Sequence, residues 1–134
     1  MCLQKLTKYH DTFYAIMRIV AGVVFTMHGL MKFGVIPGMA QLPAMYSEFW
    51  FAGCIEVVAG IAITLGIFTR CAALIATIEM AVAYLYIHAR TGGLNPLANG
   101  GEAAVLFFVI WLLVTSHGAV KWSVEKALFK KEHC

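Results

Sequence analysis

Four apolar stretches, each of about the 20 residues that a membrane-spanning helix needs, constrain this chain more than any other feature. They lie at residues 13–33, 49–68, 71–89 and 102–120. An α-helix rises 1.5 Å per residue, so each stretch is long enough to cross roughly 30 Å of hydrocarbon. Backbone groups cannot stay unpaired in lipid, and the absence of period-two alternation excludes a β-barrel. The sequence therefore predicts an all-α integral membrane protein, folded as a four-helix bundle.

The composition supports this prediction. Hydrophobic residues make up 61% of the chain and charged residues 13%, whereas a soluble domain carries about 25% charged residues. We expect one domain over residues 1–134, with the lipid bilayer as its main partner. The basic residues are scattered rather than interleaved with aromatic ones, which argues against nucleic acid. A homo-oligomer is compatible with the sequence.

The four cysteines show neither a C-x-x-C motif nor metal-ligand spacing. We therefore expect Cys54 and Cys71 to be small buried side chains, and Cys2 and Cys134 to be free thiols near the termini. The sequence carries no haem, iron–sulfur or metal signature.

The connections between the stretches have the composition of loops. Glycine and proline punctuate residues 34–47 and 92–101, and the connection at 69–70 is short enough to make an antiparallel hairpin of the second and third helices. Residues 121–134 form a basic amphipathic tail, which we expect to be helical at the membrane surface. A cleaved signal peptide is an alternative for the first stretch, but it is disfavoured because Arg18 and Lys32 bracket its apolar centre.

The distribution of basic residues predicts the orientation. Seven lie on the side of the termini and two on the opposite side, with Arg18 inside the first span. The seven are Lys5, Lys8, Arg70, Lys121, Lys126, Lys130 and Lys131, and the two are Lys32 and Arg90. The sequence thus predicts a multi-pass protein of the inner (plasma) membrane with both termini in the cytoplasm.

Seven ionisable residues lie within the predicted spans, where they are expected to be functional or to pair with one another. A charge at mid-bilayer costs about 2.5–3.5 kcal/mol on the lenient insertion scale, so each should face the bundle interior. They are Arg18, His28, Lys32, Glu56, Glu79, Glu102 and His117. In the first three helices the charged residues share a stripe with Gly and Ala, which let membrane helices approach closely.

Depth along the helices sorts these charges into two groups. Arg18 and Glu79 lie toward the middle and inner half, and we expect them to form a structural charge pair. The other group lies toward the outer ends and consists of His28, Lys32, Glu56, Glu102 and Arg90. A histidine beside a lysine and two carboxyl groups can move protons. The alternative is structural, because paired charges also fix helix register.

The order and spacing of several motifs resemble the DoxX family. The first helix carries Arg18, Gly22, Phe25, His28, Gly29, Lys32 and Phe33, and the second and third carry Glu56, Gly60, Gly66, Thr69, Arg70, Ala72, Ala73, Met80 and Ala83. Later positions that match are Gly100, Gly101, Glu102, Gly118, Ser123 and Val124. The closing motif departs from the family, because it has one glycine fewer and Glu125 in place of aspartate.

The resemblance implies a four-helix inner-membrane protein, with the whole chain as one DoxX-like domain. The family takes its name from a subunit of a thiosulfate–quinone oxidoreductase, and some relatives are linked to thiol redox complexes. No cysteines of this chain look paired, which argues against a thiol–disulfide role here. Whether the chain is an enzyme is left open by the sequence.

Two functions fit the sequence. The first is a subunit or accessory of a quinone-linked oxidoreductase, with a redox partner subunit supplying electrons. In it Glu56, His28 and Lys32 are the expected catalytic group, and the quinone-binding residues are Phe25, Tyr86, Glu102 and Arg90. The second is a non-enzymatic assembly, scaffold or small-lipophile-binding module, in which the charges only hold the bundle together. A transporter is a weaker third.

Overall fold

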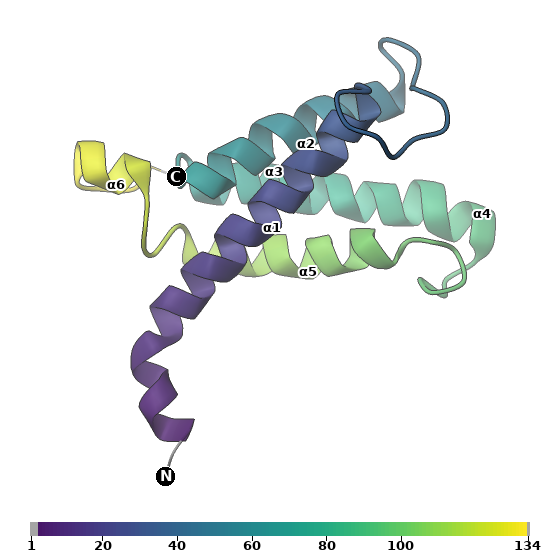
Figure 1. Ribbon diagram of the computed structural model, residues 1–134. Helices are drawn as coiled ribbons and strands as arrows, with labels where there is room; N and C mark the ends of the chain where they lie inside the picture. The colour runs from purple at the N-terminus through teal and green to yellow at the C-terminus, as the bar shows by residue number, and fades with distance from the viewer. Residues whose placement is uncertain (1–2, 134) are drawn as a thin grey trace.

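The computed structural model describes residues 3–133, and that part of the chain is helical without strands (Figure 1). A 3₁₀ helix, η1 (Leu3–Tyr9), leads into α1 (His10–Lys32), and α2 (Glu48–Leu65) follows a long loop. The α3 helix (Thr69–Val82) continues through a π-helical segment, η2 (Ala83–Ala89), into α4 (Arg90–Gly92). The chain ends with α5 (Glu102–His117) and α6 (Val124–Phe129).

Three helical runs within the described residues are long and apolar enough to cross a membrane. They are Leu6–Lys32, Glu48–Leu65 and Thr69–Gly92, and they correspond to the first three predicted spans. The fourth predicted stretch forms α5, an apolar helix of 16 residues. The all-helical class and the membrane-protein prediction are thus confirmed.

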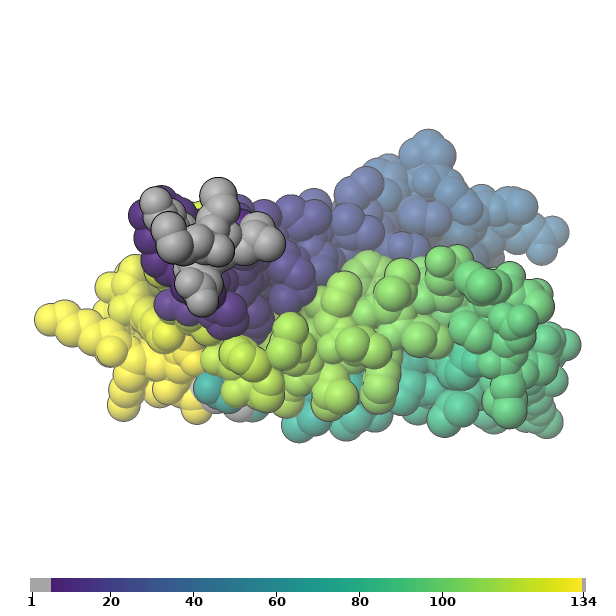
Figure 2. Space-filling view, turned by 90° about the horizontal axis from the view of Figure 1, so that it is seen from below, coloured from purple at the N-terminus to yellow at the C-terminus, as the bar shows by residue number. Residues whose placement is uncertain are grey.

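The helices pack as two pairs. The α1 helix lies mainly against α2, and α3 lies mainly against α5, while contacts between the pairs are sparser. Figure 1 shows the pairs meeting near the α2–α3 turn and diverging toward the end that carries α4 and the loop after α1. Figure 2 shows the C-terminal segment at the same end of the molecule as the start of α1, opposite to that loop.

Glycine allows the close approach of α1 and α2. Gly22 and Gly29 of α1 face Gly60 and Gly53 of α2, and a Cβ added at Gly29 would lie 2.8 Å from the Gly53 carbonyl oxygen. A Cβ at Gly60 would lie 2.8 Å from the backbone nitrogen of Thr26. These contacts leave no room for a side chain, so the prediction that the small-residue stripes face inward is confirmed for this pair.

The predicted charge pair between Arg18 and Glu79 is wrong. Arg18 is fully buried and donates hydrogen bonds to backbone carbonyls of Ile63 and Thr64 at the end of α2, and of Lys121 and Trp122 after α5. The last carbonyls of a helix have no partners within it, and a guanidinium supplies several donors in a fixed fork. Arg18 therefore joins the end of one helix to the C-terminal segment.

Depth explains why the two residues do not meet. Arg18 binds the last turn of α2, just before the hairpin, whereas Glu79 lies ten residues into α3 from Thr69. At 1.5 Å per residue, that is about 15 Å farther from the hairpin. Periodicity places residues on a face correctly, but it does not fix how far one helix slides along another.

The chain after α5 also differs from the prediction. The helix ends at His117 rather than at residue 120, because Gly118 takes a left-handed conformation with φ of 75°. The tail is helical over Val124–Phe129, and it docks on the α2–α3 turn. Ser123 donates to the Gly66 carbonyl at 2.7 Å, and buried Glu125 accepts the Phe68 amide at 3.0 Å.

The cysteine expectation holds only in part. Cys54 is free and half-buried. Cys71 is disulfide-bonded, so the prediction of unpaired cysteines is wrong at that position. The predicted roles of Cys2 and Cys134 lie outside the described residues.

Candidate functional site

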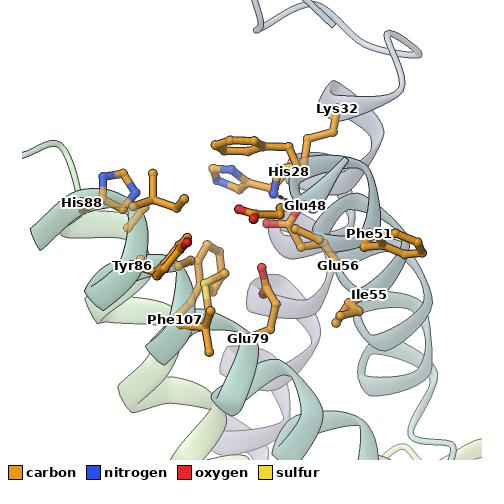
Figure 3. Close-up of a pocket in the computed structure, with 18 of the residues that line it drawn as sticks. His28, Lys32, Glu48, Phe51, Ile55, Glu56, Glu79, Tyr86, His88 and Phe107 are labelled. Atoms are coloured by element: carbon orange, nitrogen blue, oxygen red, sulfur yellow. Dashed lines mark hydrogen bonds and ion pairs between the residues drawn. The ribbon is translucent and has the colours of Figure 1, made fainter. Parts of the chain in front are cut away.

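A cavity of about 620 Å³ opens where the two helix pairs diverge (Figure 3). The α2 helix forms one wall and the α3–η2 run another, while α1 and α5 contribute the remainder. Its lining is mainly apolar with a few ionisable groups, and the ionisable and phenolic residues are His28, Lys32, Glu48, Glu56, Glu79, Tyr86 and His88. Ligand pockets commonly have this size and this mixture of apolar surface and few polar groups.

An ion pair between Lys32 and Glu56 lies at the cavity wall. The Lys32 ammonium is 2.6 Å from Glu56 Oε2, and the two side chains are 16% and 4% exposed. Lys32 is the last residue of α1, and Glu56 lies in the middle of α2 beside the glycines that bring these helices together. The sequence prediction that Lys32 pairs with Glu56 across the bundle is therefore confirmed by the distance between the two side chains.

Glu79 reaches the same cavity from α3. Its Oε2 atom is buried and has no hydrogen-bond partner among the described residues. Figure 3 shows its carboxyl group directed toward the region of Glu48 and Glu56. Buried polar atoms are nearly always hydrogen-bonded, so an oxygen without a partner that faces a cavity marks a position where a bound molecule would be stabilised.

Two histidines line the cavity toward the end of the bundle that carries α4 and the loop after α1. The His28 ring packs edge-on against Phe107, with 5.6 Å between ring centroids. His88 Nδ1 lies 3.1 Å from the carbonyl oxygen of Asn99, which fixes the ring against the loop before α5. Each histidine therefore has one orienting contact and lines the cavity.

The π-helical segment η2 forms part of the cavity wall. Ala83, Tyr86, Ile87 and His88 line the cavity from this segment. One π-helical turn contains more residues than an α-turn, so it shifts the side chains that follow it, and such segments are frequent at functional sites. The sequence pattern gave no indication of this segment.

Three of the predicted quinone-binding residues lie away from the cavity. Phe25 is fully buried and packs on Phe107 and Trp111, with centroid distances of 5.1 and 5.2 Å. It therefore contacts Phe107, which lines the cavity, but does not line the cavity itself. Arg90 is exposed and lies over the Tyr86 ring, at 5.2 Å. Glu102 is exposed in the first turn of α5, a position that carboxylates favour because of the helix dipole.

The structure adds two carboxyl groups to the site that the sequence reasoning had not placed there. Glu48 lies in the first turn of α2, one residue before the predicted second stretch, and was given no role, whereas Glu79 had been given a structural role. The spacing of Glu48, Ala52 and Glu56 at intervals of four indicates a shared helix face and could have revealed Glu48. Within the described residues, no group of three metal-ligating side chains forms.

Comparison with known proteins identifies the family. The DoxX family profile matches residues 13–89, which includes most of α1 and all of α2, α3 and η2. The chain belongs to the DoxX family. It is also similar to a protein of Haemophilus influenzae described as uncharacterized, with 37% identity over 138 residues, 96% of this chain and all of that protein. No solved structure gives a significant match.

Most of the cavity is therefore built from the part that defines this DoxX protein. His28, Lys32, Glu56 and Glu79 fall inside the matched range, whereas the wall from α5 and the docked tail fall outside it.

Proposed function

We propose that this DoxX protein crosses the bacterial inner membrane four times, with both termini in the cytoplasm. The fourth span is α5, which is apolar from Ala103 to Val114 and lies along α3. At 1.5 Å per residue its 16 residues measure about 24 Å, so the glycine-rich segment before it and the docked tail after it complete the crossing. The excess of basic residues on the side of the termini supports the orientation.

We propose further that the protein is a subunit or accessory of a quinone-linked membrane oxidoreductase system. The observation that carries this proposal is the 620 Å³ apolar cavity, which holds the Lys32–Glu56 ion pair and a second buried carboxyl group. An apolar cavity in a membrane protein suits a lipophilic ring, and polar groups at one end suit the oxygens that such a ring carries.

The residues present fit a quinone by their donor chemistry. Quinone carbonyl oxygens accept hydrogen bonds, and the Lys32 ammonium has three donors, of which the bond to Glu56 uses one. His28 lies at the same end and can donate from its ring. Phe107 and Tyr86 provide flat apolar surface nearby. A bound quinone would supply the electron-carrying chemistry, and a partner subunit or soluble substrate would supply the electrons.

The chain's own residues would bind the ring and handle protons. Lys32 holds Glu56 in place, and His28 lies beside this pair toward the outer end of α1, where it can exchange protons with solvent. Buried charges in a low-dielectric site act strongly on bound polar groups, so this pair would orient the head of a ligand. The alternative, a lipophile-binding or assembly module without redox chemistry, uses the same cavity and differs in the molecule found there.

The test is mass spectrometry of lipophilic molecules retained by the full chain after gentle purification. We expect a quinone in the wild-type protein and its loss in Glu56→Gln, because the amide keeps the shape but removes the charge that orients Lys32. Asp11→Asn makes the same chemical change at an exposed position and should retain the quinone. Full retention of the quinone by Glu56→Gln would leave Glu56 only the structural role of fixing helix register through its contact with Lys32. Retention of another lipid in place of a quinone would favour the module without redox chemistry.

A further inference from the structure

We propose that the cavity is filled sideways from the bilayer, through an opening between α2 and the α3–η2 run, by a lipophile with a long apolar tail. This inference rests on the proposed function for the identity of the ligand but not for the route. The opening is defined by residues that both line the cavity and face the outside of the molecule. They are Phe49, Phe51, Ile75, Ile78, Val82 and Tyr86.

Exposure shows that the cavity is open at these residues. Phe51 of α2 is 52% exposed, and Ile78 and Val82 of α3 are 57% and 56% exposed, although all three line the cavity. The cavity itself is open rather than enclosed. The cavity therefore reaches the molecular surface between these two helices, which also belong to the more loosely packed interface.

The position of the opening along the α3–η2 run indicates that it faces the hydrocarbon of the bilayer rather than water. Ile78 lies nine residues after Thr69, about 14 Å along a helical run that ends at Gly92. This places Ile78 near the middle of a run of 24 residues. Among the six residues of the opening, five are purely hydrocarbon side chains and the sixth is Tyr86. An aqueous solute would gain nothing from such an entrance, whereas an acyl or isoprenoid chain would.

The polar end of the cavity indicates which part of the ligand enters first. The Lys32–Glu56 pair and Glu79 Oε2 lie inside, beyond the apolar rim. A head group with acceptor oxygens can take a hydrogen bond from Lys32, while its tail remains between α2 and α3 and continues into the membrane. The structure thus favours an amphipathic lipophile over a small compact solute.

The route can be tested with the full chain in phosphatidylcholine vesicles that contain a phospholipid with a diazirine in its acyl chain. After illumination, we expect covalent label on Met80 and Phe107, which line the cavity but are only 5% and 9% exposed. Phe25 and Trp111 are fully buried away from the cavity and should carry none. Mass spectrometry of the digested protein reads each position.

A blocking variant makes the test specific. Ile78→Trp combined with Val82→Trp should lower the label on Met80 and Phe107 severalfold by filling the opening. Leu112→Trp adds the same bulk at an exposed position of α5 that does not line the cavity, and it should leave the labelling unchanged. No label on Met80 and Phe107 in the wild type, or undiminished label in the blocking variant, would overturn the lateral route.

A second arm separates the route from the identity of the ligand. An excess of a long-chain benzoquinone in the vesicles should protect Met80 and Phe107 from labelling. Labelling that the tryptophans block but the quinone does not reduce would leave the route standing and count against the quinone proposal. Conversely, a quinone that copurifies with a protein whose cavity is never labelled would leave the quinone proposal standing and overturn the route.

Discussion

Individual charges in this protein have tasks that depend on their depth in the bundle. Arg18 lies toward the end of the bundle that carries the α2–α3 turn, where it donates hydrogen bonds to the backbone carbonyls of Thr64, Lys121 and Trp122. Lys32 and Glu56 neutralise each other at the cavity, and Glu79 faces that cavity with an unpaired oxygen. The sequence singled out all four as buried and inward-facing. It assigned the wrong partner to Arg18, because a charge can be matched by backbone carbonyls that a residue pattern does not display.

The first prediction at the residue scale separates Arg18 from Glu79. Arg18→Lys replaces a forked guanidinium by a point charge, and each buried carbonyl left without a partner costs about 1–3 kcal/mol. We therefore expect the unfolding free energy in detergent to fall by about 3 kcal/mol, an order-of-magnitude figure. Glu79→Gln should change stability little, because no hydrogen bond to Oε2 is lost.

A double-mutant cycle of these two changes should be additive. Distant sites without shared partners usually add within about 0.3–0.5 kcal/mol. A coupling energy clearly above about 1 kcal/mol would mean that the two residues interact after all.

Among the elements, helix existence could be read from the sequence, but several helix ends could not. The first three spans match within a few residues because long apolar runs leave a chain in lipid no other structure. The end of α5 was misplaced because Gly118 terminates the helix by adopting φ of 75°. Its carbonyl then accepts a hydrogen bond from the Tyr14 hydroxyl at 2.8 Å, a contact between residues 104 positions apart. Such contacts depend on the packed structure.

The docked tail carries a pH prediction at this scale. Burial alone would raise the pKa of Glu125, but hydrogen bonds from His133 and from the Phe68 amide outweigh it, and the pKa is lowered overall. A carboxyl group with a lowered pKa in the folded state stabilises that state above its unfolded pKa of about 4.3. This contribution is lost as the pH falls through the folded pKa.

We expect Glu125→Gln to lower the melting temperature in detergent at pH 7, because the amide cannot replace a carboxylate that accepts several hydrogen bonds. The difference from the wild type should shrink as the pH falls below about 4.3 and through the lowered pKa of the folded state, where the wild-type carboxylate becomes protonated as well. Asp11→Asn, at an exposed position, should follow the wild-type curve. A gap between Glu125→Gln and the wild type that is constant across this range would contradict the proposed role of the ionised carboxylate.

At the scale of the whole molecule, the cavity follows from the way two helix pairs diverge. Close glycine contacts hold α1 against α2, and a separate interface holds α3 against α5. The sequence showed which faces are small and which residues are charged. It did not show that the pairs separate at one end, because divergence depends on interhelical angles. For this reason Lys32 and Glu56 could be predicted as neighbours, whereas the opening beside Ile78 could not.

The orientation of the whole molecule decides which compartment the cavity faces. In the orientation we propose from seven basic residues on the side of the termini against two on the other, the docked tail lies in the cytoplasm, and His28 and His88 lie toward the periplasm. A reporter that is active only in the periplasm should therefore be silent when fused after residue 134. The same reporter inserted within the loop at residues 93–101 should be active, which controls for expression and folding. An active C-terminal fusion together with a silent loop insertion would show that the orientation is opposite to the proposed one. The polar end of the cavity would then be accessible from the cytoplasm.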